Sequence, residues 1–111
     1  MLLSNFIYYL CNVILFKMIK IEQFNGAKKG KFIAYIDGKK AGLLEYIWNE
    51  RQSFSITHTE VFPEFKGMGI GKVLLEKAVE YAREEIVKII PTCSFAQSQF
   101  SKNDEIKDVL E

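Results

Sequence analysis

A run of glycines is the feature of this 111-residue sequence with the clearest capacity for chemistry. Gly67, Gly69 and Gly71 lie between a β-rich segment and an amphipathic one. Glycine lets the backbone turn sharply and lets a ligand approach it closely. A helix that begins there would add unpaired N–H groups and a partial positive charge, which favour phosphate or pyrophosphate. The run therefore predicts either an anion-binding site or a turn that packs a helix on a sheet.

Two well-known phosphate motifs do not fit this spacing. The P-loop needs four residues between its first glycine and a Gly-Lys pair that precedes Ser or Thr. Here only three residues separate Gly67 from Gly71, and Val73 follows the lysine. The dinucleotide fingerprint needs a further Gly or Ala where this chain has Lys72 or Leu74. Both motifs are therefore excluded.

The residues before the glycine run predict an antiparallel meander of four strands. Four segments are rich in β-formers or alternate between apolar and polar residues: 18–24, 31–37, 40–48 and 53–61. Asp37-Gly38, between the second and third segments, is a strong hairpin signal. Strict alternation in the fourth segment places four side chains on one face: Phe54, Ile56, His58 and Glu60.

The residues after Pro63 change to a helical period. Residues 69–85 predict an amphipathic helix, and 86–90 form a short apolar run that predicts a buried strand. This strand is expected to be parallel to 53–61, because a helix connects the two. Short helices are expected at 94–101 and after Asn103. The predicted fold class is therefore α+β with a mixed sheet.

The order of elements and the glycine run together resemble the GNAT superfamily of acyl-CoA N-acyltransferases. In motif A of that superfamily, a basic residue or glutamine precedes two residues, a glycine, one residue, and a glycine or alanine. Lys66, Gly69 and Gly71 occupy those positions, although lysine replaces the usual arginine or glutamine. The segment Pro91-Thr92-Cys93-Ser94 and the short length are similar to a small stand-alone branch of the superfamily. The resemblance extends from Met18 to Leu110.

The resemblance implies acetyl-CoA as the cofactor, with its pyrophosphate on the N–H groups of the glycine run. In this fold the fourth and fifth strands splay apart, and the pantetheine arm would enter the gap and pair with the backbone at Val61 and Phe62. The ring of Phe95 or of Phe100 could line the CoA channel. The alternative is that both rings belong to the hydrophobic core. The expected cofactor-binding residues are Val61, Phe62, Lys66, Gly67, Met68, Gly69, Ile70, Gly71, Lys72, Ser94, Phe95 and Phe100.

Transfer to an amine needs a base for the ammonium and benefits from an acid for the departing thiolate. Glu60 and His58 are the candidate bases. The alternative is that Glu60 is a surface or structural carboxylate and that His58 is a hydrogen-bonded histidine of the sheet. The tyrosine that many members use as the acid has no counterpart, since no Tyr follows Tyr81. Cys93 ends the fifth expected strand and is the candidate nucleophile or thiol acid. Its alternative role is that of a small buried hydrophobe.

The sequence thus predicts an acyl-CoA-dependent N-acyltransferase that moves an acetyl group to a primary amine of a small molecule or a protein. A CoA-binding module with little or no transferase activity is the alternative. Short loops at 25–30 and 49–52 are expected to recognise the acceptor. A local basic patch is expected near one end of the hairpin, where it would attract an acidic acceptor or, as the favoured interpretation, form an ordinary solvated loop face. Its members are Lys28, Lys29, Lys31, Lys39 and Lys40.

Composition narrows the remaining possibilities. The chain has 15 basic and 14 acidic residues, so nucleic acid is not an expected partner. Its hydrophobic share of 49% and charged share of 26% are typical of a soluble single domain, for which a cytoplasmic location is expected. Cys11 and Cys93 are too far apart for a Cys-x-x-Cys zinc motif, and no metal site is predicted.

The first seventeen residues differ from the rest, because no charge appears before Lys17. A membrane-spanning helix needs about 20 apolar residues, so a membrane anchor is the least favoured interpretation. Neither a basic region nor a small-residue cleavage site marks a secretory signal. We interpret 1–17 as an apolar extension before a GNAT-like domain at 18–111, with Met18 as a possible true start. An extra strand or helix packed on the core is the alternative.

Overall fold

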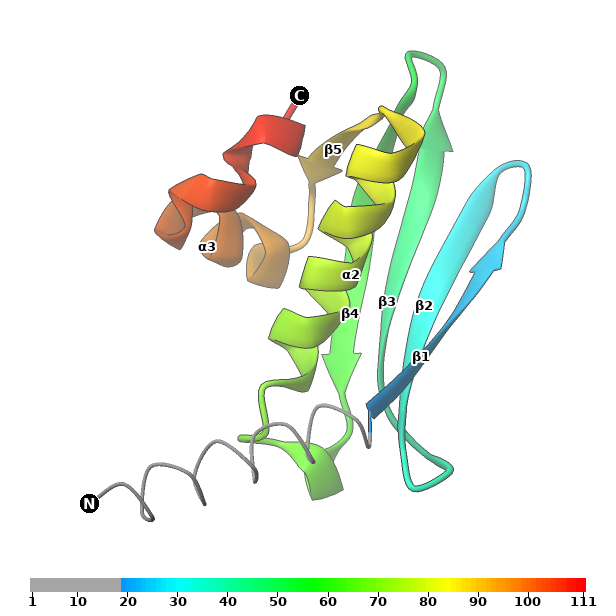
Figure 1. The fold of residues 1–111 in the computed structure, drawn as a ribbon, viewed down its shortest axis with the longest axis vertical. Helices are drawn as coiled ribbons and strands as arrows, with labels where there is room; N and C mark the ends of the chain where they lie inside the picture. The colour runs from blue at the N-terminus through cyan, green and yellow to red at the C-terminus, as the bar shows by residue number, and fades with distance from the viewer. Residues whose placement is uncertain (1–18) are drawn as a thin grey trace, which may run out of the picture.

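The computed structural model describes residues 19–111, so the predictions for 1–17 and for Met18 lie outside the described residues. Five strands form one sheet in the order β1-β2-β3-β4-β5 (Figure 1). The strands are β1 (Ile19–Asn25), β2 (Lys29–Ile36), β3 (Lys39–Asn49), β4 (Ser53–Val61) and β5 (Lys88–Pro91). The first four are antiparallel neighbours and β5 is parallel to β4, which confirms the predicted mixed sheet.

The helices follow β4 and lie on one side of the sheet (Figure 1). They are the 3-10 helix η1 (Pro63–Phe65), the helices α2 (Ile70–Glu85) and α3 (Ser94–Lys102), and the 3-10 helix η2 (Asp104–Val109). The segment after Asn103 was predicted as a helix and is a 3-10 helix. The Asn103 side chain caps it by accepting the Glu105 N–H at 3.0 Å. No helix between residues 19 and 111 is long and apolar enough to cross a membrane.

The core forms between α2 and the sheet. Apolar residues recur every three or four positions along α2, so one side of the helix is buried. Its buried side chains are Ile70, Leu74, Leu75, Ala78, Val79 and Ala82. They pack in one cluster with buried sheet residues such as Phe32, Leu44 and Ile56. This packing fixes the N-terminus of α2 relative to β4.

The fifth strand is shorter than the predicted 86–90. Ile86 ends α2 in a left-handed conformation with φ 55°, and its side chain is 84% exposed. The Val87 N–H donates to the Ala82 carbonyl, so this residue also belongs to the end of the helix. A continuous apolar run predicts a strand by hydrophobicity alone and does not reveal where a helix ends.

The C-terminal residues are bound to both α2 and β5. The Arg83 guanidinium donates two hydrogen bonds to the Asp108 carboxylate, at 2.8 and 3.0 Å. This hydrogen bonding lowers the pKa of Asp108 below its ordinary value. The Glu111 N–H donates to the Ile89 carbonyl at 3.1 Å. The edge of β5 that faces away from β4 is therefore covered by the end of the chain.

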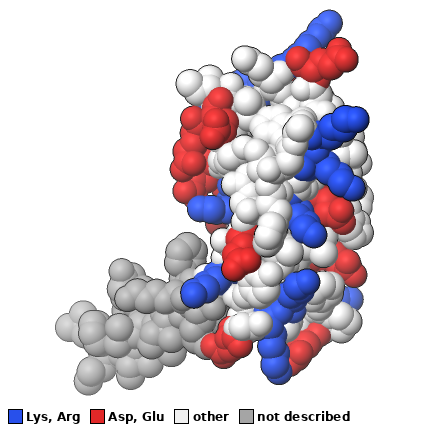
Figure 2. All heavy atoms as spheres, turned by 90° about the vertical axis from the view of Figure 1, so that its right-hand side faces the viewer, with Lys and Arg blue, Asp and Glu red and all other residues white. Residues whose placement is uncertain are grey.

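The five lysines predicted as one basic patch do not gather. Lys28 and Lys29 lie at the β1–β2 turn, whereas Lys39 and Lys40 lie at the opposite end of β2, beside the β2–β3 turn. The prediction is wrong because the length of a strand separates the two groups. The molecular face in Figure 2 carries both basic and acidic side chains.

Candidate active site

A β-bulge in β4 decides which way the candidate side chains point. Glu45 of β3 lies opposite His58 and Tyr46 lies opposite Ile56, so Thr57 is an extra residue on β4. An extra residue exchanges the two faces of the strand beyond it. The prediction that Phe54, Ile56, His58 and Glu60 share one face is therefore wrong, since strict alternation does not include a bulge.

Beyond the bulge, β4 presents different residues to its two sides. Thr59 lies opposite the buried Leu44, so it faces α2. His58 and Glu60 face away from α2, on what we call the outer face of the sheet. Their side chains contact each other there, with His58 Nε2 3.6 Å from Glu60 Oε2. About half of each side chain is exposed (56% and 50%), so both are accessible to a substrate on that side.

Strand β5 pairs with only the first part of β4. Their pairing runs from Ser53 to Ile56, where the Ile56 carbonyl accepts the N–H groups of Thr92 and Cys93 at 3.1 and 3.0 Å. The chain then turns into α3. Among residues 19–111, no strand pairs with β4 beyond Ile56 on that side. We call this segment, 57–61, the open edge of β4.

The backbone direction at the open edge follows from one hydrogen bond. The Phe62 N–H donates to the Ala41 carbonyl at 2.9 Å, so it is directed toward β3. Backbone groups alternate sides along a strand, which directs those of Thr59 and Val61 toward the open edge. The backbone of Val61 is therefore free to pair with an extended ligand, whereas the Phe62 N–H is already bonded to β3.

The glycine run forms an exposed loop that leads into α2. Gly67 and Gly69 have φ values of 85° and 77°, which favour glycine, and a Cβ at either position would meet no atom of residues 19–111 within 4 Å. Gly69 is the N-cap of α2, and no side chain bonds to the first turn. The first backbone bond runs from the Val73 N–H to the Gly69 carbonyl, at 3.1 Å. Within the described part of the chain, the helix N-terminus therefore presents N–H donors that have no partner.

The other four predicted binding residues of the glycine loop and the first turn of α2 differ in how exposed they are. Lys66, Met68 and Lys72 are exposed, so their side chains are available to a ligand. Ile70 is only 1% exposed and packs in the core, so it offers its backbone alone. The Lys66 N–H already donates to the Pro63 carbonyl at 3.4 Å.

Gly71, Phe95 and Phe100 have contacts that the spacing of residues in the sequence did not predict. A Cβ on Gly71 would lie 2.8 Å from Cζ of Phe95, so the missing side chain of this buried glycine makes room for a ring of α3, and Gly71 offers a ligand its backbone N–H alone. Phe100 is 2% exposed and belongs to the core. Phe95 is partly buried, and its ring lies beside the first turn of α2, where it can still contact a ligand. Sequence spacing could not separate these roles, because α3 returns to α2 only in the folded chain.

A Gly71→Ala chain is expected to lose about 1–3 kcal/mol of unfolding free energy, because the added methyl displaces the Phe95 ring. Adding Phe95→Leu should recover part of this loss, since the smaller side chain leaves space for the methyl group. Urea unfolding of the two single variants and the double variant measures the coupling. Additive losses would contradict the contact.

Cys93 lies at the junction of β5 and α3. It is the N-cap of α3, and its Sγ accepts the Ala96 N–H at 3.4 Å. The same sulfur lies 3.6 Å from Oγ1 of Thr59, on β4. Ser94 is exposed and begins α3. Sequence reasoning did not select Thr59, because no local signal indicates a contact between residues 34 positions apart.

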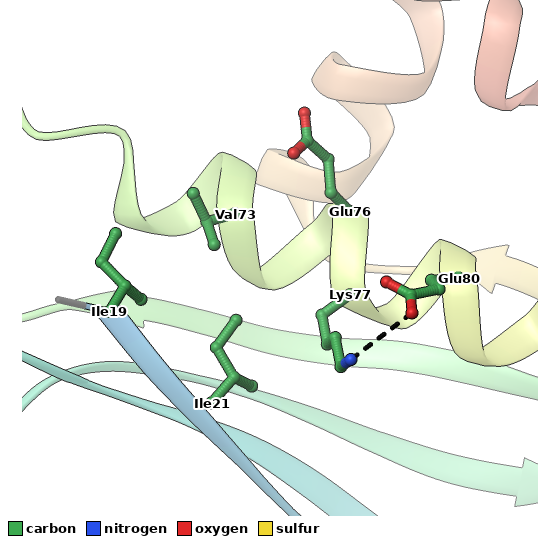
Figure 3. Close-up of a pocket in the computed structure, with 6 residues that line it drawn as sticks. All are labelled: Ile19, Ile21, Val73, Glu76, Lys77 and Glu80. Carbon is green, nitrogen blue, oxygen red and sulfur yellow. Dashed lines mark ion pairs between the residues drawn. The ribbon is translucent and has the colours of Figure 1, made fainter. Parts of the chain in front are cut away.

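A separate hollow lies between β1 and α2 (Figure 3). Its volume is about 290 Å³, and an ion pair of 3.5 Å between Lys77 and Glu80 lies on its α2 side. Its lining residues are Ile19, Ile21, Val73, Glu76, Lys77 and Glu80. None of them is a predicted site residue, so this hollow is not part of the candidate site.

These features define a class of protein. A mixed sheet with an open edge on β4, followed by a glycine loop and an uncapped helix, is the GNAT architecture that the sequence predicted. The chain belongs to the GCN5-related N-acetyltransferase family, whose sequence model matches residues 31–109. By its description, that family is one of N-acetyl-transferases.

Three known proteins are similar to the chain. An "Uncharacterized N-acetyltransferase" of Archaeoglobus fulgidus is 38% identical over 68 residues, which are 56% of this chain and 46% of that protein, so the chain spans about half of that relative's length. A GCN5-like protein of Staphylococcus aureus is 34% identical, with a TM-score of 0.66 and coverage of 85% of this chain and 89% of that one. A GNAT acetyltransferase of Elizabethkingia anophelis, solved with acetyl-CoA bound, shares the fold at 14% identity, with a TM-score of 0.62 and coverage of 77% and 73%.

Proposed function

We propose that this chain transfers an acetyl group from acetyl-CoA to a primary amine of a small molecule or a protein. The observation that carries the proposal is the open edge of β4 beside the uncapped, glycine-lined start of α2. Acetyl-CoA combines an anionic pyrophosphate with an extended arm that contains amide groups. The helix start supplies donors for the anion, and the open edge supplies backbone partners for the arm.

The individual residues fit this ligand. The loop glycines at 67 and 69 leave space for a close approach of the pyrophosphate, and the N–H groups of residues 69–72 can donate to it. The exposed ammonium groups of Lys66 and Lys72 can balance its charge. Backbone groups of Val61 can pair with the arm. When bound, acetyl-CoA supplies an acetyl group activated as a thioester, and an N–H at the open edge can stabilise the developing oxyanion. The related Elizabethkingia fold, solved with acetyl-CoA bound, supports the choice of ligand.

The bulge suggests how the chemistry is divided between the two sides of the sheet. Cys93 and Thr59 lie on the α2 side of β4, whereas His58 and Glu60 lie on the outer face. We therefore expect the amine to approach from the outer face, where Glu60 or His58 removes a proton from the ammonium. The Cys93 thiol, on the other side, is then positioned to protonate the departing thiolate.

Release of the CoA thiol in the presence of amines tests this function. The full chain is incubated with acetyl-CoA and a panel of primary amines that includes diamines, amino acid amides and lysine peptides. Free thiol is followed with a chromogenic disulfide. At least one primary amine is expected to accelerate release, whereas trimethylamine, which has no N–H to replace, is not. Tight binding of CoA without release under any condition would contradict transfer and indicate a binding module.

A further inference from the structure

We infer that Thr59 is a positioning residue, which holds the Cys93 thiol at the open edge of β4 during acetyl transfer. The inference rests on the proposed function, since it concerns the group that we expect to protonate the departing thiolate. Thr59 Oγ1 lies 3.6 Å from Cys93 Sγ, and either atom can be the donor. No other side-chain hydroxyl among residues 19–111 bonds to this sulfur.

The surroundings of Cys93 leave its sulfur little freedom. The Cys93 N–H donates to the Ile56 carbonyl at 3.0 Å, which fixes the backbone where β5 ends. The Ala96 N–H donates to Sγ at 3.4 Å, which fixes the side chain as a helix cap. Thr59 reaches the same sulfur from β4 because the bulge at Thr57 turns residue 59 toward α2. Three contacts from two elements, β4 and α3, therefore hold Cys93 and its thiol beside the open edge.

The two hydrogen-bond partners of the sulfur differ in one chemical respect. The Ala96 N–H can only donate, so it stabilises the thiolate more than the thiol. The Thr59 hydroxyl can accept from the thiol S–H and, after a rotation, can donate to the thiolate. Thr59 is therefore the partner that can change from acceptor to donor when the thiol loses its proton, whereas the Ala96 N–H is a donor in both states.

This property suits a proton transfer to the leaving group. The Cys93 S–H bond breaks, and its proton forms the S–H bond of free CoA with the departing thiolate. Cys93 remains as a thiolate, with the Thr59 O–H and the Ala96 N–H as donors. Solvent then returns a proton to Cys93. The ammonium loses two protons, one before its nitrogen attacks and one as the C–N bond forms and the C–S bond of the thioester breaks. Both leave to solvent from the outer face, so one net proton is released in each cycle. The cycle is balanced without an oxidant or a further reactant.

The test compares wild type with Thr59→Val, Thr59→Ser and the control Thr57→Val. Valine keeps the shape of threonine without the hydroxyl, whereas serine keeps the hydroxyl. Thr57 lies on the same strand, but its hydroxyl bonds to the Glu45 carbonyl. The rate of Cys93 alkylation by iodoacetamide at pH 8 is measured by mass spectrometry of the peptide that contains Cys93, so that Cys11 does not contribute.

Thr59→Val is expected to slow Cys93 alkylation about fivefold. The Thr59 hydroxyl orients the sulfur and donates a hydrogen bond to the negative charge that the reacting sulfur carries, so its loss slows the reaction. Thr59→Ser should restore the rate, and Thr57→Val should match wild type. In acetyl transfer, Thr59→Val should lower kcat and leave KM for acetyl-CoA within twofold.

The outcomes separate this inference from the proposed function. Equal alkylation rates in wild type and Thr59→Val would overturn the positioning role. Slow alkylation in both Thr59 variants would also overturn it, because serine retains the hydroxyl and the defect would then come from packing. A hydroxyl-dependent rate in a protein that transfers no acetyl group would support the contact and refute the proposed function.

Discussion

A Gly69→Val chain is expected to bind acetyl-CoA about a hundredfold more weakly than wild type. Gly69 has a φ of 77°, a conformation that costs a β-branched residue about 1–2 kcal/mol. Relaxation of that strain turns the first N–H groups of α2 away from the anion, and the valine methyl groups occupy the open approach. Loss of about two hydrogen bonds to a charged group accounts for an effect of this size. Isothermal titration calorimetry measures the affinity.

Gly38→Val is the matched control for this variant. Gly38 has a φ of 79°, and a Cβ there would also meet no atom of the described residues within 4 Å. It lies in the β2–β3 turn, so valine imposes the same backbone strain away from the glycine loop. The two variants should lose similar unfolding free energy, but only Gly69→Val should lose affinity. Equal affinities in both variants would contradict a pyrophosphate site at the start of α2.

A Glu60→Gln chain is expected to show a kcat about a hundredfold lower than wild type, with KM for acetyl-CoA unchanged. General-base catalysis contributes at least this factor, and glutamine cannot take a proton from the ammonium. The Glu60 side chain lies on the outer face, whereas the N-terminus of α2 lies on the other side of the sheet, so cofactor binding should not change. The measurement is steady-state thiol release with the best amine from the panel. The activity of the variant should recover as pH rises, because a larger fraction of the amine substrate is then unprotonated and needs no base.

The controls for Glu60→Gln use other residues of the outer face. Glu22→Gln, on β1, removes the same charge at a distance from the open edge and should keep wild-type activity. His58→Gln tests the partner of Glu60, from which it is 3.6 Å away. If the two act as a unit, the double variant should lose no more activity than the worse single variant. Full activity in all of these variants would show that neither residue is the base.

Local signals in the sequence were sufficient for most of the fold. The Asp37-Gly38 turn, the alternation in β2 to β4 and the apolar side of α2 each depend on neighbouring residues. The glycine run likewise marked the start of α2, since positive φ at two of its glycines is a local property. These signals placed the mixed sheet and the candidate loop correctly.

The features that the sequence did not reveal depend on contacts between distant residues. The bulge at Thr57 is defined by its register with β3, and it moved His58 and Glu60 to the outer face. Gly71 serves Phe95 because α3 packs on the start of α2. The contact between Thr59 and Cys93 joins two elements that meet only in the folded sheet. Such relations have no periodic or compositional signature.

A thermal-shift titration of the full chain with acetyl-CoA tests the central claim most directly. A ligand that binds only the folded state raises Tm, and the gain is about 2.7 kcal/mol at a concentration one hundred times Kd. The parallel titration uses the acetyl thioester of N-acetylcysteamine, which has the reactive group but no pyrophosphate. The account predicts a rise in Tm that grows with acetyl-CoA and is much smaller with the short thioester. An unchanged Tm at millimolar acetyl-CoA would contradict the account.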